Sequence, residues 1–254
     1  MTLFHLSELS TRAAKEVGGS EGAIGLVATG ATEQHGPHLP LSTDTGVARA
    51  LQRRVPELLD CDVLASPLID VAMSDPQLGY AGTISLAEEV FAEIVYAHLR
   101  GLRSTGLKRI VVIDFNAPNF AGSARAVERF RAEFDDVQIA HQDDLDWLIA
   151  SLWRAADHPE KVSPDHAGRI ETSLALAVYD PAQIGDFEQL VGYTEFADDW
   201  WDQLLEHGTE HLSPVGVLGI PSGANAEEGE RILSAIVEDY AAWIDEQLHV
   251  GLRS

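Results

Sequence analysis

The chain of 254 residues is 45% hydrophobic and 23% charged, which provides apolar surface for one substantial core and excludes a disordered chain. No uninterrupted apolar run approaches the roughly 18 residues that a membrane-spanning helix needs, so an integral membrane protein is excluded as well. The 41 acidic and 17 basic residues give a formal net charge of −24, which disfavours nucleic acids and anionic membranes as partners because both are negatively charged.

Four short apolar runs predict strands. Such continuous runs are typical of strands that are buried on both faces of a parallel sheet. They lie at residues 24–28, 62–66, 109–115 and, more weakly, 137–141.

Helical patterns lie between and after these runs. Each pattern has a helix-start signal, an apolar stripe of helical spacing, or both, and polar residues occupy the opposite face. The patterns are the capping-box pair Ser85 and Glu88 with a stripe as far as Leu102, the stripe of Val127, Phe130 and Phe134, and the pair Asn225 and Glu228 with a stripe as far as Ile244. The alternation of strands and helices predicts one α/β domain over residues 1–254 with a mainly parallel sheet.

The densest group of chemically useful side chains directly follows the first predicted strand. Ligand sites in open α/β sheets lie beyond the carboxyl ends of strands, so this position favours a functional site. Glu33 and His35 point to the same side if the extended backbone continues, and Pro37 and Pro40 stiffen the loop that leads to Asp44. This set of oxygen and nitrogen donors suits Zn²⁺, Mn²⁺ or Fe²⁺, as one or two ions.

Each of these residues also has a structural interpretation. Asp44 precedes a predicted helix and would serve as its N-cap. Glu33 and His35 would be a solvated pair in a loop, and His38 would be structural or would support a ligand without binding the metal. The occurrence of all four within twelve residues favours the metal site.

The sequence at residues 33–41, Glu-Gln-His-Gly-Pro-His-Leu-Pro-Leu, followed by Thr43-Asp44, resembles the signature of the creatininase (creatinine amidohydrolase) family. Further blocks that resemble the family occur in its order at residues 82–86, 166–173, 216–221 and 226–229. The resemblance implies a creatininase-like three-layer α/β/α fold, a two-metal centre and hydrolysis of a non-peptide C–N bond. It also implies a homo-oligomer, often a hexamer in this family.

The resemblance implies roles for individual residues. Glu33 would bind one metal, His35 would bind the other, and Asp44 would bridge the two. His166 matches the histidine near the scissile bond, where it would be catalytic. Glu171 lies in the same block as His166 and is a second catalytic candidate.

The chain departs from the family pattern at four positions. Asn116 replaces a histidine that completes the first metal site, and Gln77 stands where members often have a histidine. Creatinine-cleaving members have a glutamate ligand at the position of Pro118 and a tryptophan at the position of Val162. Creatinine is therefore not the expected substrate.

Asn116 remains a possible ligand through its amide oxygen, although an amide is a weaker donor than imidazole. Asp114 and Glu171 are the carboxylates that would compensate. Asp114 would alternatively be a buried acceptor at a strand end, and Glu171 an exposed acid in the first turn of a helix. Asn119 is expected to orient the group at position 116, and His38, Asp114, Asn119 and Gln77 are assigned to supporting or substrate-binding positions.

The remaining histidines belong to no motif, and surface or core positions are expected for them: His5, His98, His141, His158, His207, His211 and His249. Trp200 and Trp201 would form a lid, an oligomer contact or ordinary packing, and we favour packing.

These features predict a metal-dependent amidohydrolase that cleaves a cyclic amide or a formamide with metal-activated water. His166 would carry the proton to the departing nitrogen, because the imidazole pKa near 6.5 suits both steps. The alternative is a pseudoenzyme that keeps the fold and binds a ligand or supports an assembly. Asn116 and Gln77 are the residues that favour this alternative.

The predicted partners are a small-molecule amide and further copies of the chain. The single cysteine, Cys61, cannot form an intrachain disulfide, and a cytoplasmic location is expected. The acid excess combined with only three lysines, Lys15, Lys108 and Lys161, predicts a halophilic protein. An acidic mesophilic enzyme is the alternative.

Overall fold

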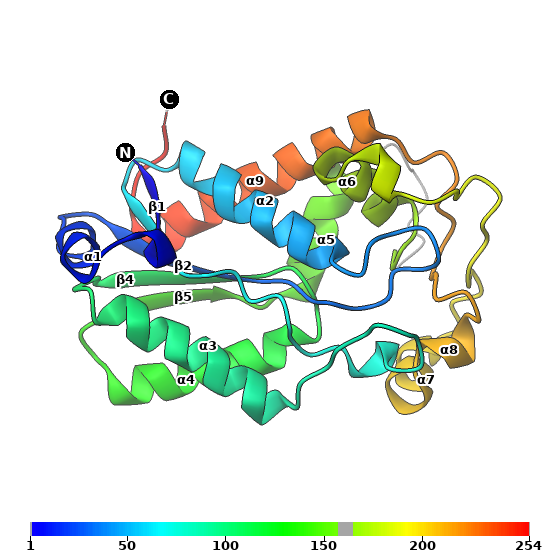
Figure 1. Ribbon diagram of the computed structural model, residues 1–254, viewed down its shortest axis with the longest axis horizontal. Coiled ribbons are helices and arrows are strands. Elements are labelled where there is room, and N and C mark those ends of the chain that lie inside the picture. Colours follow the sequence, from blue (N-terminus) through cyan, green and yellow to red (C-terminus); the bar gives the residue numbers. More distant parts are fainter. Residues whose placement is uncertain (1, 157–164, 254) are drawn as a thin grey trace.

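The computed structural model describes residues 2–156 and 165–253. Its centre is a sheet of five parallel strands in the spatial order β1-β3-β2-β4-β5 (Figure 1). The strands are β1 (Leu3–His5), β2 (Ile24–Thr29), β3 (Val63–Ala65), β4 (Arg109–Asp114) and β5 (Gln138–Gln142). The sequence predicted β2, β3, β4 and β5 and missed β1, an edge strand of three residues.

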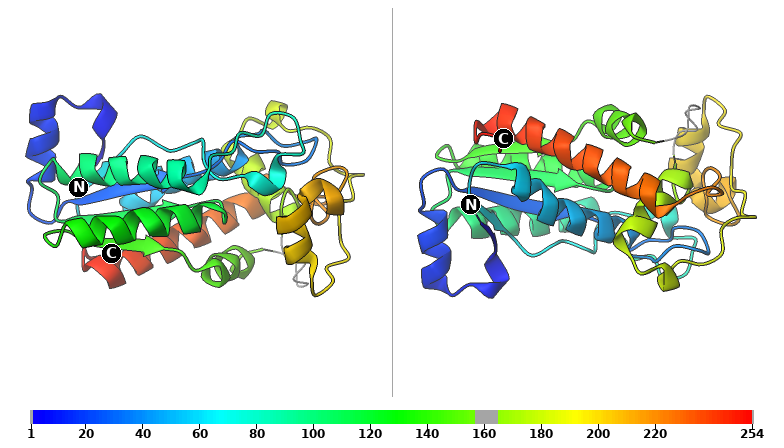
Figure 2. Two further views of the ribbon diagram at one scale, coloured as in Figure 1. Left: turned by 90° about the horizontal axis from the view of Figure 1, so that it is seen from below. Right: turned by 90° about the horizontal axis from the view of Figure 1, so that it is seen from above.

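Helices cover both faces of the sheet, which confirms the predicted three-layer α/β/α fold (Figures 1 and 2). One face carries α3 (Glu88–Arg103) and α4 (Asn119–Glu133). The other face carries α2 (Thr43–Leu58), α5 (Leu145–Arg154), α6 (Arg169–Val178) and α9 (Ala226–Leu248). None of the helices within the described ranges is long and apolar enough to cross a membrane.

Shorter elements complete the described part of the chain. They are η1 (Leu6–Glu8), α1 (Thr11–Gly18), η2 (Asp75–Gln77), η3 (Pro181–Gln183), α7 (Trp200–His207) and α8 (Thr209–Leu212). Of these, η2 and α7 matter most for function, because both contribute to the wall of the cavity described below.

The central parts of β2 and β4, residues 24–28 and 110–113, are continuously apolar because each side of the sheet faces a core. Ile24 and Leu26 of β2 pack in the core with α2 and α9, whereas Val27 packs in the core with α3 and α4. Successive side chains of a strand point to opposite faces, so a strand between two helix layers needs apolar residues at every position. All six residues of β2 are buried accordingly.

The two predicted helix starts have different outcomes. Asn225 caps α9, since its Oδ1 accepts a hydrogen bond of 2.9 Å from the backbone N–H of Glu228. Ser85 does not cap α3, which begins at Glu88 without a side-chain cap. The capping-box prediction for Ser85 is wrong because its hydroxyl donates instead to the carboxylate of Asp75, at 2.5 Å.

The polar loop that follows β2 is held close to the carboxyl edge of the sheet. Thr29 at the end of β2 pairs in register with Asp114 at the end of β4. Gly30 then passes so near the start of α2 that a Cβ atom there would lie 2.6 Å from the Cα of Thr45. The first turn of α2 is therefore fixed beside the loop that carries Glu33 and His35.

The contact between α6 and α9 depends on Gly229. A Cβ atom at this position would lie 1.8 Å from the carbonyl oxygen of Ser173 in α6. We expect Gly229→Ala to separate the helices and to lower stability by about 2–3 kcal/mol, or roughly 5–10 °C in melting temperature. Gly101→Ala in α3 is the control, because a Cβ atom there meets nothing within 4 Å and should stabilise the helix by up to about 1 kcal/mol. Equal melting temperatures for the two variants would contradict the close contact.

Candidate metal centre

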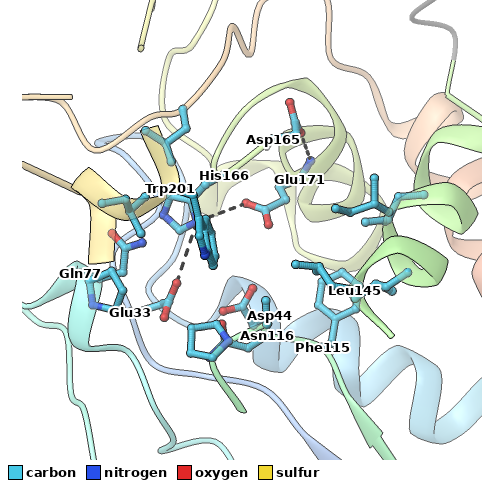
Figure 3. A pocket seen from close by; sticks show the side chains of 18 of the residues that line it. Glu33, Asp44, Gln77, Phe115, Asn116, Leu145, Asp165, His166, Glu171 and Trp201 are labelled. Atoms are coloured by element: carbon cyan, nitrogen blue, oxygen red, sulfur yellow. Dashed lines mark hydrogen bonds and ion pairs between the residues drawn. The ribbon is translucent and has the colours of Figure 1, made fainter. Parts of the chain in front are cut away.

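Five titratable side chains converge beyond the carboxyl edge of the sheet, and Figure 3 shows all of them except His35. Glu33 and His35 lie in the loop after β2, and Asp44 lies in the first turn of α2. His166 lies three residues before the start of α6, and Glu171 lies in the first turn of α6. The site therefore joins two segments that are more than a hundred residues apart in the sequence.

The structural alternatives for Glu33, His35 and Asp44 are wrong. Glu33 and His35 are not a solvated pair, since they are only 3% and 0% exposed. Asp44 is not the N-cap of α2, because Ser42 occupies that position and Asp44 is buried inside the first turn. Since Asp44 does not cap the helix, its burial needs another explanation.

One candidate ligand group consists of His35, Asp44 and Glu171. The Nδ1 atom of His35 lies 3.2 Å from the backbone carbonyl of Glu33, so it is placed to donate there. Its Nε2 atom faces the Asp44 Oδ1 at 3.2 Å and the Glu171 Oε2 at 3.4 Å. Donation from Nδ1 leaves a lone pair on Nε2, which points between the two carboxylates.

A second candidate group consists of Glu33, His35 and His166. The Nδ1 atom of His166 lies 3.9 Å from the Glu33 Oε1 and 3.9 Å from the Glu171 Oε2. The Nε2 atom of His166 lies 3.0 Å from the backbone carbonyl of Gln34, which fixes the plane of the ring. The two imidazoles are neighbours, with ring centroids 4.4 Å apart.

These residues fit a divalent transition metal. Three buried ligand atoms have no hydrogen-bond partner among the described residues, namely the Glu33 Oε2, the His35 Nε2 and the Asp44 Oδ2. Buried polar atoms are otherwise almost always paired, because desolvation without a partner is costly. Separations of 3.2–3.9 Å between donor atoms are what ligands at about 2.0–2.2 Å from a shared ion would show.

Without a metal, the clustered groups strongly perturb one another. Burial raises the pKa of Glu33 to about 8, and the charge of Asp44 adds to the effect. Burial also raises the pKa of Glu171 to about 8. Burial alone would lower the pKa of His35, but the carboxylates of Asp44 and Glu171 outweigh it and raise that pKa to about 10. The pKa of His166 is well below its ordinary value, mainly because of burial.

Metal binding should therefore weaken as the pH falls. The carboxyl groups of Glu33 and Glu171 hold protons below about pH 8, the His35 imidazole holds one below about pH 10, and a metal must displace them. From pH 8 to pH 6, each proton displaced from one of these groups lowers the affinity about tenfold per pH unit, or about 100-fold per displaced proton. Calorimetric titration with Zn²⁺ at both pH values, in buffers of different ionisation enthalpy, measures the affinity and counts the released protons. A pH-independent affinity would contradict this origin of the pKa shifts.

Glu171 is held at the cluster by the geometry at the start of α6. Its Oε2 accepts a hydrogen bond of 2.6 Å from the backbone N–H of Ala167, a residue with a φ of 54°. Asp165 accepts from the backbone N–H groups of Ile170 and Glu171, at 2.6 and 3.1 Å. Glu171 is thus not the exposed first-turn acid of the alternative interpretation, since its side chain is 19% exposed and faces His35. Sequence analysis missed Asp165, although an acid just ahead of a helix is a capping signal.

Asp114 and Asn119 form a buried network below the cluster. Asp114 accepts from Thr29, Ser123 and His141, at 2.5, 3.0 and 2.8 Å, and is a strand-end acceptor that belongs to neither ligand group. Asn119 donates to the Thr29 Oγ1 at 2.9 Å. This network joins the ends of β2, β4 and β5, so it positions the loops above them.

Asn116 lies at the wall of the cavity beside the cluster. Its Nδ2 donates to the backbone carbonyl of Met73 at 2.8 Å and to the Asn119 Oδ1 at 3.1 Å. The Asn119 Oδ1 therefore holds the Asn116 amide group in one orientation. Both amide hydrogens are used in these bonds, and the amide oxygen is the only atom of this side chain that could bind a metal.

Gln77 and His38 support the loop after β2. The Nε2 of Gln34 lies 2.6 Å from the Oε1 of Gln77 and 2.9 Å from the Nε2 of His166. His38 lies 2.9 Å from the Oγ1 of Thr172 in α6. Burial and the charge of His35 lower the pKa of His38 to about 4. Gln77 and His38 thus connect the loop after β2 to the segments that face it.

The cluster opens into a cavity of about 720 Å³. Besides the acids and His166, its wall contains Phe115 after β4, apolar residues of α5, and both tryptophans of α7. Packing was the favoured interpretation for Trp200 and Trp201, and their rings do pack edge to face at 5.2 Å. They also form part of the cavity wall, which the sequence analysis did not predict.

Of the histidines without a motif, His141 is a satisfied core residue, bonded to Asp114. His98 is bonded to Ser66 at 3.0 Å. His158, Lys161 and Val162 lie outside the described residues.

Comparison with known proteins identifies the family. The model described as "Creatininase: Creatinine amidohydrolase" matches residues 7–244. The chain belongs to the creatininase family. A mycofactocin precursor peptide peptidase of Mycolicibacterium smegmatis is 31% identical over 223 residues, which are 85% of this chain and 82% of that protein. The creatinine amidohydrolase of Pseudomonas putida is 25% identical over 238 residues, which are 87% of this chain and 88% of that protein.

Solved creatininase structures have the same fold. A tryptophan-to-alanine mutant creatininase superposes with a TM-score of 0.76 at 23% identity and covers 96% of this chain and 98% of its own. A structure named Creatininase Mn gives a TM-score of 0.74 at 22% identity, with 96% and 98% coverage. A mutant creatininase of Zn-Zn type gives a TM-score of 0.76 at 22% identity, with 97% and 98% coverage. This member of the family is thus a creatininase-like hydrolase with a candidate metal site.

Proposed function

We propose that this protein is a metal-dependent amidohydrolase that adds water across an amide C–N bond. The observation that carries this proposal is the ligand group of His35, Asp44 and Glu171, whose donor atoms converge and open into a cavity. Catalytic zinc sites characteristically have three protein ligands and leave one coordination position for water or substrate.

The cofactor proposed is Zn, Mn or Fe, as one or two ions. Creatininase structures named for Mn and for Zn support the first two metals. His35, Asp44 and Glu171 would hold one ion. A second ion would be held by Glu33 with Asp44 as the bridge, and Asn116 would offer its amide oxygen where the family has a histidine. Since an amide is the weaker donor, we expect the second ion to bind less tightly.

When bound, the ion acts as a Lewis acid that polarises the amide carbonyl and makes water nucleophilic near neutral pH. The chain supplies the proton transfer. His166 is held by the Gln34 carbonyl at Nε2, so its Nδ1 remains available beside Glu33 and Glu171. Burial lowers its pKa well below the ordinary value on which the sequence-based role rested, so the neutral ring presents the Nδ1 lone pair to a proton from water but is a weaker base than expected. The proton then passes to the departing nitrogen, and the products are a carboxylic acid and an amine.

The type of amide is the finer part of the proposal. The family resemblance favours a non-peptide bond, as in a cyclic amide or a formamide. Relatives at 31% identity are named for a precursor peptide, so peptide C–N bonds belong in the test as well. Pro118 occupies the position of a ligand in creatinine-cleaving members, and creatinine is not expected to be cleaved. A homo-oligomer, often a hexamer in this family, and a cytoplasmic location remain predictions.

The test is a hydrolysis assay with the metal-loaded protein. Zn²⁺-, Mn²⁺- and Fe²⁺-loaded samples are incubated with cyclic amides, N-formyl amines, creatinine and short peptides, and the released amines are measured. Glu171→Gln should lose at least about 100-fold in rate, because it removes a ligand charge. Glu246→Gln, at an exposed position in α9, is the matched control and should retain full activity.

The competing function is a pseudoenzyme that binds a ligand or supports an assembly. It requires metal or ligand binding without amide hydrolysis. Stoichiometric metal with no amine released from any substrate would therefore favour the pseudoenzyme. Hydrolysis that Glu171→Gln abolishes would exclude it.

A further inference from the structure

The cavity has one polar region and extensive apolar walls. The polar region is the cluster around Glu33, Asp44 and Glu171. One apolar wall consists of Phe115 and the face of α5 that carries Leu145, Leu148, Ile149 and Leu152. The other consists of the face of α7 that carries Trp200, Trp201, Leu204 and Leu205. Figure 3 shows the acids between Trp201 on one side and Leu145 with Phe115 on the other.

The charge of the wall does not suit an anionic substrate. Asp75 and Asp165 add two further acids to the cavity. Among the described residues that line it, none is a lysine or an arginine. The nearby Arg169 is paired with Glu228 at 2.9 Å. Divalent ions at the cluster would balance the ligand acids and would leave little positive charge to hold a substrate carboxylate.

The size of the cavity does not suit a very small amide. A volume of about 720 Å³ lies within the range of about 300–1,000 Å³ that is usual for pockets that enclose drug-sized ligands. Unsubstituted formamide or creatinine would leave most of this space to water, against walls that offer few polar partners. Apolar walls gain affinity only when an apolar group displaces that water.

We propose that the substrate is an uncharged amide with a bulky apolar substituent, and that the walls of α5 and α7 bind this substituent while the amide lies at the cluster. This inference rests on the proposed function and adds the substrate class to it. The aromatic rings of Phe115, Trp200 and Trp201 favour an aromatic or branched group, because flat rings pack well against both kinds. Trp201 and Leu205 determine specificity at the open side of the cavity, where they are 38% and 58% exposed.

The test measures binding of three matched probes by calorimetry, with metal-free and Zn²⁺-loaded protein. N-Benzoylglycinamide is neutral and aromatic, N-acetylglycinamide lacks the ring, and N-benzoylglycine replaces the terminal amide by a carboxylate. We expect the neutral aromatic probe to bind at least tenfold more tightly than the acetyl probe, which corresponds to about 1.4 kcal/mol. In the metal-free protein it should also bind at least tenfold more tightly than the carboxylate probe.

Two variants assign the effect to the wall of α7. Trp201→Ala and Leu205→Ala should each weaken binding of the benzoyl amide at least fivefold and leave binding of the acetyl amide unchanged. Leu252→Ala is the matched control, because Leu252 is 47% exposed and does not line the cavity. It should leave the affinity for all three probes unchanged.

The outcomes separate this inference from the proposed function. Equal affinities for the benzoyl and acetyl amides, or tighter binding of the carboxylate by metal-free protein, would overturn the substrate class, even if amides are hydrolysed. Selective binding of the benzoyl amide that depends on Trp201 would support the substrate class, even if no amide in the assay is cleaved.

Discussion

Asp44→Asn is expected to lower the affinity for a divalent metal at least about 100-fold, or about 2.8 kcal/mol. Asp44 is 4% exposed, its Oδ1 lies 3.2 Å from the Nε2 of His35, and its Oδ2 has no hydrogen-bond partner in the part of the chain that the structure describes. The amide keeps the shape of the side chain but removes the charge and one strong donor atom. The loss therefore reports coordination and not a change of packing.

Elemental analysis and calorimetric titration measure this effect. Asp60→Asn is the control, because Asp60 is an exposed acid just beyond the end of α2. Glu33→Gln provides a second comparison, since Glu33 belongs to the other ligand group. If two ions bind, this variant should keep the ion at His35, Asp44 and Glu171 and lose the second. Wild-type metal content in Asp44→Asn would rule out the assignment of Asp44 as a ligand.

The melting temperature is expected to rise by at least about 6 °C between 0.1 M and 2 M KCl, which corresponds to about 2–3 kcal/mol. The net charge of −24 means that acidic side chains on the surface repel one another. The Debye length falls from about 10 Å at 0.1 M salt to about 3 Å at 1 M, so added salt screens this repulsion. Basic residues are already engaged in surface ion pairs such as Arg54–Glu230 and Lys108–Asp136. The excess acids therefore depend on salt for screening.

A charge-reduced variant distinguishes screening from a general salt effect. Glu128→Lys combined with Glu246→Lys replaces two exposed acids on α4 and α9. This variant should melt at a higher temperature than the wild type in 0.1 M KCl and should gain less from added salt. A wild-type melting temperature that does not change between 0.1 M and 2 M KCl would contradict the halophilic interpretation and would leave the metal site unaffected.

Local patterns were sufficient to predict the inner strands and the longest helices. A strand between two helix layers needs apolar side chains on both faces, and residues 24–28 of β2 and 110–113 of β4 show this directly. The Asn225 cap was also predictable, because it involves a residue only three positions away. The Ser85 cap does not form because Asp75, which is ten positions away in the sequence, binds the Ser85 hydroxyl instead.

The sequence by itself determined the layered α/β fold and the chemistry of the first motif, because both depend on residues that are close in the chain. Glu33, His35 and Asp44 lie within twelve residues, and the end of β2 places them at the edge of the sheet. Only the tertiary structure decided that Glu171 completes a ligand group and that α5 and α7 enclose the cavity. The contact of Gly229 with Ser173 sets the position of α6, and no local pattern encodes such an approach between segments that are far apart in the chain.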